Sequence, residues 1–276
     1  MMKYFSPCLL FALAVMFCAD APALAQPKPA LSVKGRLVDA TVEIDDKLKA
    51  YPGLSASLLA DSKRWIERMQ AEADKERRED IALFRDAQRW ILERSYEQRA
   101  TTGRYVSVVR NDEIDTGGNN SVTVTDAIVW DREGRKRVGI RPFFKEAADN
   151  GPTMKALARL VRIAVAAEKI ARDLPDPLEP EKPSSSLTAE TYAERDQLTA
   201  EAVQPKLAGL GPVTLAPSSV AGKSSGLTFH FAPYTVGFPA EGAYTVFVAW
   251  TEFKSYLSAE GAAIFAGDRP EGDKAQ

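Results

Sequence analysis

Residues 226–257, GLTFHFAPYTVGFPAEGAYTVFVAWTEFKSYL, form the densest apolar and aromatic segment outside the amino-terminal leader. Apolar runs lie at both ends of the segment, and Pro and Gly residues separate them. Apolar runs around such a break predict two strands joined by a turn. The end of the segment predicts a short helix. We therefore expect this stretch to complete the fold and to supply core residues, including Phe229, Phe231 and Phe253.

Upstream, turn-rich spacers separate short apolar runs, a pattern typical of an antiparallel meander. Strands are predicted from Leu31 and over residues 105–109, 122–130 and 137–140. The type of residues 90–101 is ambiguous, and we favour a strand in the second half. These segments predict one antiparallel sheet.

Helical spacing of apolar residues appears in three stretches. A long helix is predicted to begin at Ser55 or Ser57, after the break at Tyr51-Pro52-Gly53, and to continue through residues 81–87. A second helix begins at Pro152. A third spans residues 188–203, with Thr188 or Thr191 as its cap. The predicted class is α+β, a compact mixed fold in which two or three helices pack on an antiparallel sheet.

The amino terminus has the pattern of a secretory signal peptide. Lys3 precedes the apolar run 9–17, and Ala23-Leu24-Ala25 has the small residues of a cleavage site. We expect cleavage after Ala25 and a periplasmic or cell-surface location. The alternative is a lipoprotein acylated at Cys18, although the bulky Phe17 before it is unfavourable for such a site.

The mature chain divides by composition into five parts. Residues 26–30 are a tether, and 31–174 form a first half. The Pro-rich segment 175–186 predicts an extended linker. Residues 187–265 form a second half that folds together with the first. Residues 266–276 are Gly-, Asp- and Pro-rich and predict a disordered tail.

Composition excludes several kinds of chemistry. The net charge of −2 provides no basic excess for nucleic acid. Both cysteines lie in the leader, so the mature chain has no thiolate nucleophile and no cysteine ligand for a metal. Its one histidine, His230, alternates with Phe229 and Phe231, which predicts a partly exposed position on the opposite face of a strand. We predict no catalytic residue, no metal site and no cofactor.

Five residues are candidates for binding. Tyr234, Phe238 and Tyr244 have the character of exposed aromatics that can form a recognition surface, although core positions are the commoner outcome. Asp112 and Asp115 lie in an acidic loop without the spacing of a calcium loop. A solvated hairpin turn is the simpler interpretation of that loop. The basic hairpin 132–141 fits either a charged edge strand or contact with an anionic envelope polymer.

Several short motifs resemble a known pair of domains. In chain order they are Tyr51-Pro52-Gly53-Leu54, Thr116-Gly117-Gly118, Trp130-Asp131, Phe231-x-Pro233-Tyr234 and Ala240-Glu241-Gly242. Their order and spacing are similar to paired domains of unknown function. Such pairs occur in the extracellular region of RsiV-type (lysozyme-sensing) anti-sigma factors and in the amino-terminal region of PdaC-type peptidoglycan deacetylases. The resemblance covers residues 31–257.

The resemblance implies an envelope location and a mixed α/β fold, but not an activity. Relatives often have Ala-His where this chain has Asn119-Asn120, so no role of that histidine transfers. We expect no deacetylase domain, no sigma-binding segment and no transmembrane segment after removal of the leader.

These observations predict an exported, non-enzymatic binding protein of the periplasm or envelope. Its partner would be an envelope protein or a cell-wall component. One alternative is a lysozyme-binding or inhibitor-like protein, for which an acidic face would be needed because lysozymes are commonly basic. Another alternative is a carboxylate-dependent cell-wall hydrolase.

Overall fold

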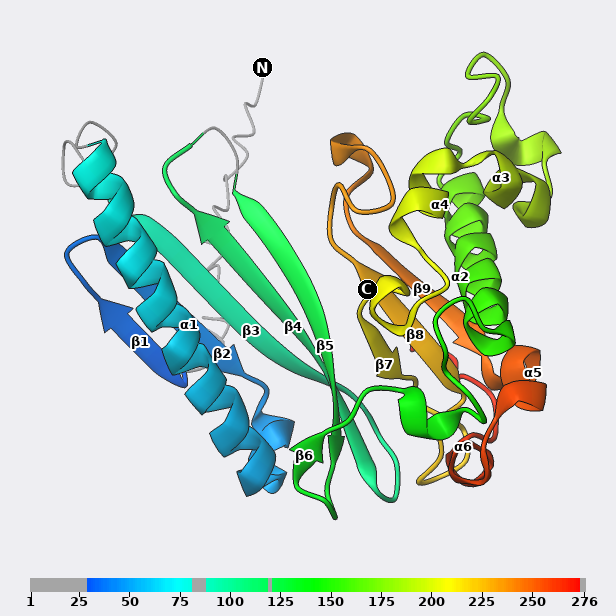
Figure 1. Ribbon diagram of the computed structural model, residues 1–276, viewed down its shortest axis with the longest axis horizontal. Helices are drawn as coiled ribbons and strands as arrows, with labels where there is room; N and C mark the ends of the chain where they lie inside the picture. The colour runs from blue at the N-terminus through cyan, green and yellow to red at the C-terminus, as the bar shows by residue number, and fades with distance from the viewer. Residues whose placement is uncertain (1–28, 81–87, 119–120, 274–276) are drawn as a thin grey trace, which may run out of the picture.

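The computed structural model describes residues 29–80, 88–118 and 121–273, and Figure 1 shows their arrangement in two β-sheets with helices on the outer sides. The predicted α+β class is confirmed. The leader, the predicted helical residues 81–87 and the turn residues Asn119 and Asn120 lie outside the described ranges. No helix within these ranges is both long enough and apolar enough to cross a membrane.

The large sheet has six strands in the order β1-β2-β3-β4-β5-β6. All neighbours are antiparallel except β2 and β3, which run parallel, so the sheet is mixed where a purely antiparallel one was expected. A parallel pair needs a long crossover connection, and helix α1 lies in that connection. The strands are β1 (Leu31–Lys34), β2 (Val38–Ile44), β3 (Trp90–Thr101), β4 (Tyr105–Asp115), β5 (Val122–Asp131) and β6 (Lys136–Arg137).

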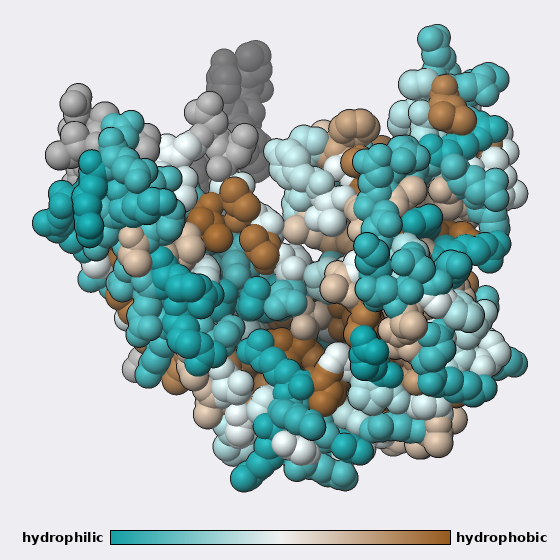
Figure 2. Space-filling view, viewed as in Figure 1, coloured by the Kyte–Doolittle hydropathy of each residue, from teal (hydrophilic) through white to brown (hydrophobic). Residues whose placement is uncertain are grey.

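Helix α1 (Pro52–Glu79) covers one face of the large sheet. It begins before the predicted Ser55 because Pro52 is tolerated in the first turn, where its missing N–H has no intrahelical partner to lose. Leu54, Leu58 and Trp65 are buried against the strands. The outward face of the helix is hydrophilic, as Figure 2 shows.

The small sheet contains three antiparallel strands in the order β7-β8-β9. They are β7 (Val213–Leu215), β8 (Gly226–Phe231) and β9 (Tyr244–Ala249), followed by the short helix α5 (Trp250–Phe253). The strand, turn, strand and helix predicted for residues 226–257 are therefore confirmed. All six residues of β8 are buried, because both faces of the small sheet are covered.

The remaining helices are α2 (Pro152–Ala171), α3 (Ala189–Arg195), α4 (Gln197–Ala202) and α6 (Ala259–Ile264). Helix α2 packs against β9 and α3, so the layers run from α1 through the large sheet and the small sheet to α2 (Figure 1). The helix expected over residues 188–203 is divided at Asp196. This residue ends α3, and its Oδ1 accepts the N–H of Thr199 at 3.1 Å to cap α4.

A shared core joins the two halves. Tyr105 of β4 lies edge-on to Phe143 with 5.1 Å between ring centroids, and Phe265 lies 5.9 Å from Phe143 and 5.2 Å from Phe253. The Ser107 hydroxyl on β4 also accepts the N–H of Leu215 at 2.9 Å. The large sheet is thus covered by α1 on one face and, over part of the other, by the second half.

Two segments expected to be irregular are folded. In the Pro-rich segment, Pro175 and Pro183 form a β-bridge, and buried Asp176 pairs with Arg195 of α3. The predicted disordered tail is wrong for residues 266–273. The Gly267 carbonyl accepts the Trp250 indole N–H at 3.0 Å, so specific contacts hold this segment despite its Gly- and Pro-rich composition.

Candidate functional site

A cleft of about 630 Å³ lies where the two sheets diverge. Figure 2 shows the notch between the two halves, which is open at the top and closed below by the shared core. The large sheet contributes the residues of its uncovered face, and the small sheet and its β8–β9 loop contribute the opposite wall. The large-sheet residues are Thr41, Glu43, Glu93, Arg94, Ser95, Glu97, Val109, Asn111, Glu113, Thr123 and Thr125. The opposite wall includes His230, Phe231, Pro233, Ala243 and Thr245.

Strand register brings these large-sheet residues into rows. One row across β2 to β5 is Thr41, Glu93, Glu113 and Thr123. The next row is Glu43, Ser95, Asn111 and Thr125, in which the Thr125 hydroxyl donates to the Asn111 side-chain oxygen at 2.9 Å. Alternate residues of a strand point to opposite faces, so the intervening side chains lie under α1.

Four carboxylates define what we call the acidic face: Glu43, Glu93, Glu97 and Glu113. All four are exposed. Glu97 pairs with Arg99 at 2.9 Å, whereas the other three form no ion pair within the described residues. Glu93 and Glu113 stand directly opposite each other on neighbouring strands. Like charges in that arrangement repel each other. A cationic partner relieves this repulsion, so its binding to the acidic face is electrostatically favourable.

The acidic face does not have the geometry of a metal site. Within the part of the chain that the structure describes, no group of three or more His, Cys, Asp or Glu side chains is placed to hold a metal ion. The carboxylates are spread over several rows of the sheet. Such a distribution suits a broad charged surface.

Asp112, a candidate for binding, lies on the other face of the sheet and is buried. It was expected in a solvated turn, but β4 continues through it to Asp115. Arg94 of β3 binds its two carboxylate oxygens through Nε and Nη2, each at 2.6 Å. The Arg94 guanidinium also lies 4.0 Å above the ring of Trp65 on α1. Asp112 is therefore a structural residue.

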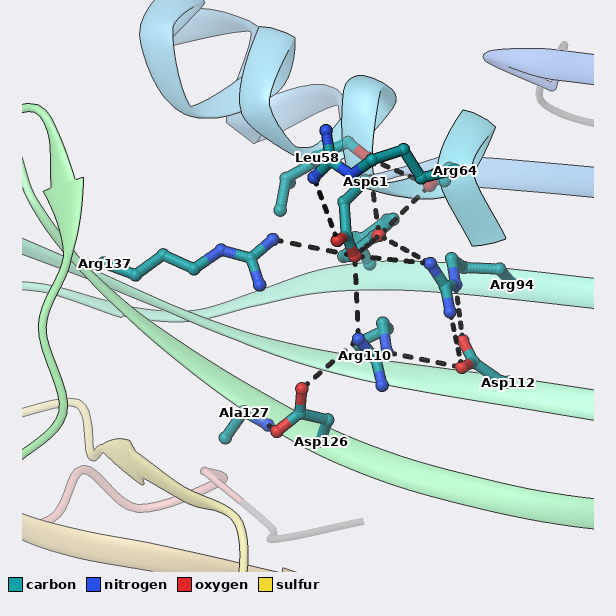
Figure 3. A network of polar contacts seen from close by, with 11 residues as sticks. Leu58, Asp61, Arg64, Arg94, Arg110, Asp112, Asp126, Ala127 and Arg137 are labelled. Carbon is teal, nitrogen blue, oxygen red and sulfur yellow. Dashed lines mark hydrogen bonds and ion pairs between the residues drawn. The ribbon is translucent and has the colours of Figure 1, made fainter. Parts of the chain in front are cut away.

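This pair belongs to a polar network between α1 and the sheet, shown in Figure 3. Asp61 of α1 lies at its centre, within 3.4 to 3.7 Å of four arginines. Arg110 links it onward to Asp126 at 3.2 Å. The four arginines around Asp61 are Arg64, Arg94, Arg110 and Arg137. Arg137 comes from the edge strand β6, so one arginine of the basic hairpin forms an ion pair within the fold.

The other candidates fall in different places. Asp115 is exposed at the end of β4 and accepts the N–H of Gly117 at 2.7 Å. Tyr234 and Phe238 are exposed in the β8–β9 loop. Tyr244 is only 1% exposed, so it has the core position that was the commoner outcome for such a residue and not a place on a recognition surface. Its ring packs under Arg172, and its hydroxyl donates to Glu241.

His230 is also buried, not partly exposed as expected, because the large sheet covers the face of β8 opposite the phenylalanines. Its Nε2 forms a 2.9 Å hydrogen bond with the Thr214 hydroxyl. Burial, with a smaller contribution from Arg99, lowers the pKa of His230 to about 4. This neutral imidazole supports the packing of the small sheet.

The depressed pKa of His230 predicts a specific dependence of stability on pH. The unfolded chain takes up a proton near pH 6.5 and the folded chain only near pH 4, so stability present above pH 6.5 is lost as pH falls between these values. The loss is about 3 kcal/mol. Urea unfolding at pH 7 and pH 4 measures it, and His230→Gln should lack this part of the loss. Equal pH dependence in both proteins would contradict the assignment.

Sequence reasoning did not single out Glu43, Glu93, Glu97 or Glu113. One signal was present: residues 90–97, WILERSYE, alternate between Trp90, Leu92 and Tyr96 on one face and Glu93 and Glu97 on the other. The approach of Glu43 and Glu113 depends on pairing with two other strands. That pairing is a property of the folded sheet.

The chain is similar to solved structures of the DUF3298 family, a class of proteins whose function is unknown. It is similar to a family member from Bacteroides fragilis, with a TM-score of 0.49 and 14% sequence identity over 83% of this chain and 91% of that one. It is also similar to a DUF3298 family protein from Pseudomonas aeruginosa PAO1, with a TM-score of 0.49 and 10% identity over 89% and 100% of the two chains. No protein-family model and no curated protein matches the chain.

Proposed function

We propose that the protein is an exported, non-enzymatic binding protein of the cell envelope that takes a basic protein partner on its acidic face. The single observation that carries this proposal is the group of three exposed carboxylates, Glu43, Glu93 and Glu113, which share one sheet face and form no ion pair with any other described residue. The signal-peptide pattern and the resemblance to envelope-protein domains support the location.

The negative charge of the acidic face indicates that its partner is positively charged. Clustered carboxylates attract cationic proteins and speed their encounter, and they repel nucleic acid and anionic lipid headgroups. Lysozyme is the first probe because lysozymes are commonly basic. The acidic face provides the surface that such a partner requires.

Charge reversal on the acidic face tests the proposal. We expect the Glu93→Lys/Glu113→Lys variant to bind lysozyme at least about tenfold more weakly than the wild type, mainly through slower association. Surface plasmon resonance at two salt concentrations measures both rates. The matched control is Asp74→Lys/Glu79→Lys, which makes the same change in net charge on exposed positions of α1.

Retained affinity in the control, with loss in the acidic-face variant, supports the site. Equal loss in both variants assigns the effect to net charge and overturns the acidic face as the binding surface. No measurable binding by the wild type overturns lysozyme as a partner.

The facing pair Glu93 and Glu113 gives a second candidate function, a carboxylate-dependent hydrolase, since two carboxylates suffice for glycoside cleavage. Both side chains are exposed, whereas the general acid of such enzymes has a pKa raised by its environment. Exposure therefore favours binding over catalysis. We expect no turnover of peptidoglycan fragments, and turnover that disappears in Glu93→Gln would establish the hydrolase instead.

A further inference from the structure

The loop between β8 and β9, residues 232–243, carries two exposed aromatic rings. Tyr234 is 61% exposed and Phe238 is 70% exposed. Figure 1 shows the loop at the upper end of the small sheet, beside the opening between the two halves. Pro233 and Ala243, near its two ends, line the cleft that contains the acidic face. We call this loop the aromatic arm.

The backbone of the arm is strained at Tyr234. The Thr235 N–H donates to the Ala232 carbonyl at 3.2 Å, and Tyr234 has a φ of 70° at the third position of that turn. Gly or Asn is the usual residue there, because a side chain at positive φ is unfavourable. The tyrosine is therefore unfavourable at this position, and its side chain forms no hydrogen bond with another described residue that would offset the cost. Strain of this kind is concentrated at functional sites.

The arm is nevertheless held in one conformation. Val236, between the two rings, is fully buried, and its carbonyl accepts the Thr199 hydroxyl at 3.1 Å. Glu241 accepts the N–H of Phe238 at 2.7 Å. Arg172, the residue directly after α2, donates to the carbonyl of Glu241 at 2.8 Å and to that of Ala243 at 3.1 Å. The rings are thus presented on a fixed scaffold, which reduces the entropy lost on binding.

We propose that the aromatic arm is the apolar half of the partner-binding surface, with Tyr234 and Phe238 as its anchors. The inference rests on the proposed function and specifies the partner further. The partner is a basic protein whose contacting segment carries an apolar side chain beside its lysine or arginine. The cationic group meets the acidic face while the apolar group packs on the rings. Exposed aromatic anchors are the residues that dominate such interfaces.

The two halves of the surface have different kinetic signatures. Charged groups act mainly on association and its salt dependence, whereas packed anchors act on dissociation. With lysozyme as the probe, the Tyr234→Ala/Phe238→Ala variant of the full chain should dissociate about 30-fold faster. Its association rate and salt dependence should remain those of the wild type. Leu178→Ala, at another exposed apolar position, is the control and should bind normally.

A second variant separates binding from folding. Tyr234→Gly relieves the positive φ, so its melting temperature should rise while its dissociation becomes faster. A lower melting temperature would show that the tyrosine serves the fold and would overturn the inference. Dissociation within twofold of the wild type in the double alanine variant would also overturn it. If the acidic-face variant still loses affinity in that case, the proposed function stands and only the arm is removed from it.

Discussion

The Asp112→Ala variant is expected to lose about 3 to 5 kcal/mol of its free energy of unfolding. Arg94 has a side chain only 2% exposed, and its guanidinium is bound at both ends of the Asp112 carboxylate. Removing that carboxylate leaves a buried cation whose remaining ion-pair partner among the described residues is the partly exposed Asp61, at 3.4 Å. Urea denaturation followed by circular dichroism measures the change.

Two further variants test the reason for this loss. Asp126→Ala removes a carboxylate from the same network, but that side chain is 44% exposed, so its loss should cost at most about 1 kcal/mol. Replacing both partners, as Arg94→Met with Asp112→Leu, should recover most of the stability because no unpaired charge remains. An Asp112→Ala loss no larger than that of Asp126→Ala would contradict the structural role assigned to the pair.

The Phe253→Ala variant is expected to lose about 3 to 5 kcal/mol. Its ring is fully buried and lies 5.8 Å from the ring of Phe144 and 5.2 Å from that of Phe265. The truncation opens a cavity in the core that joins the two halves, and the rings of Phe144 and Phe265 both lose a packing partner. Chemical denaturation gives the magnitude.

Phe238→Ala provides the matched control, because it removes the same ring from a position that is 70% exposed. Its effect on stability should be within about 0.5 kcal/mol. Similar losses in the two variants would mean that the core does not depend on Phe253. The same control variant is informative for binding, since we expect its effect there to be large.

The sequence alone predicted the class of fold and the carboxyl-terminal hairpin, because period-two apolar runs and Pro-Gly breaks are local signals. It did not predict the buried strand position of Asp112. Acidic residues before a Thr-Gly-Gly turn favour a loop, and the partner that keeps Asp112 in a strand is Arg94, 18 residues earlier. The partial exposure expected for His230 was wrong for a related reason, since its burial depends on the large sheet, which another part of the chain supplies.

The acidic face was unpredictable for a geometric reason. Near the turn, Thr101 pairs with Val106, and counting back from that pair would place Glu93 opposite Ile114. A bulge between Gln98 and Ala100 shifts the register by one residue and places Glu93 opposite Glu113. A shift of one residue moves every side chain to the other face, so the row of carboxylates exists only because of this bulge.

The position of α2 has a consequence for dividing the chain. In sequence it precedes the Pro-rich segment, but it packs against β9 and α3, which follow that segment. A fragment beginning at residue 187 would lack the helix that covers its sheet, and apolar residues such as Val161 and Val165 would leave the core they share with β8 and β9. Such a fragment should aggregate on expression, whereas one that begins before Pro152 retains the helix that covers one face of the small sheet. Any exchange of this half between related genes would have to carry α2 with it.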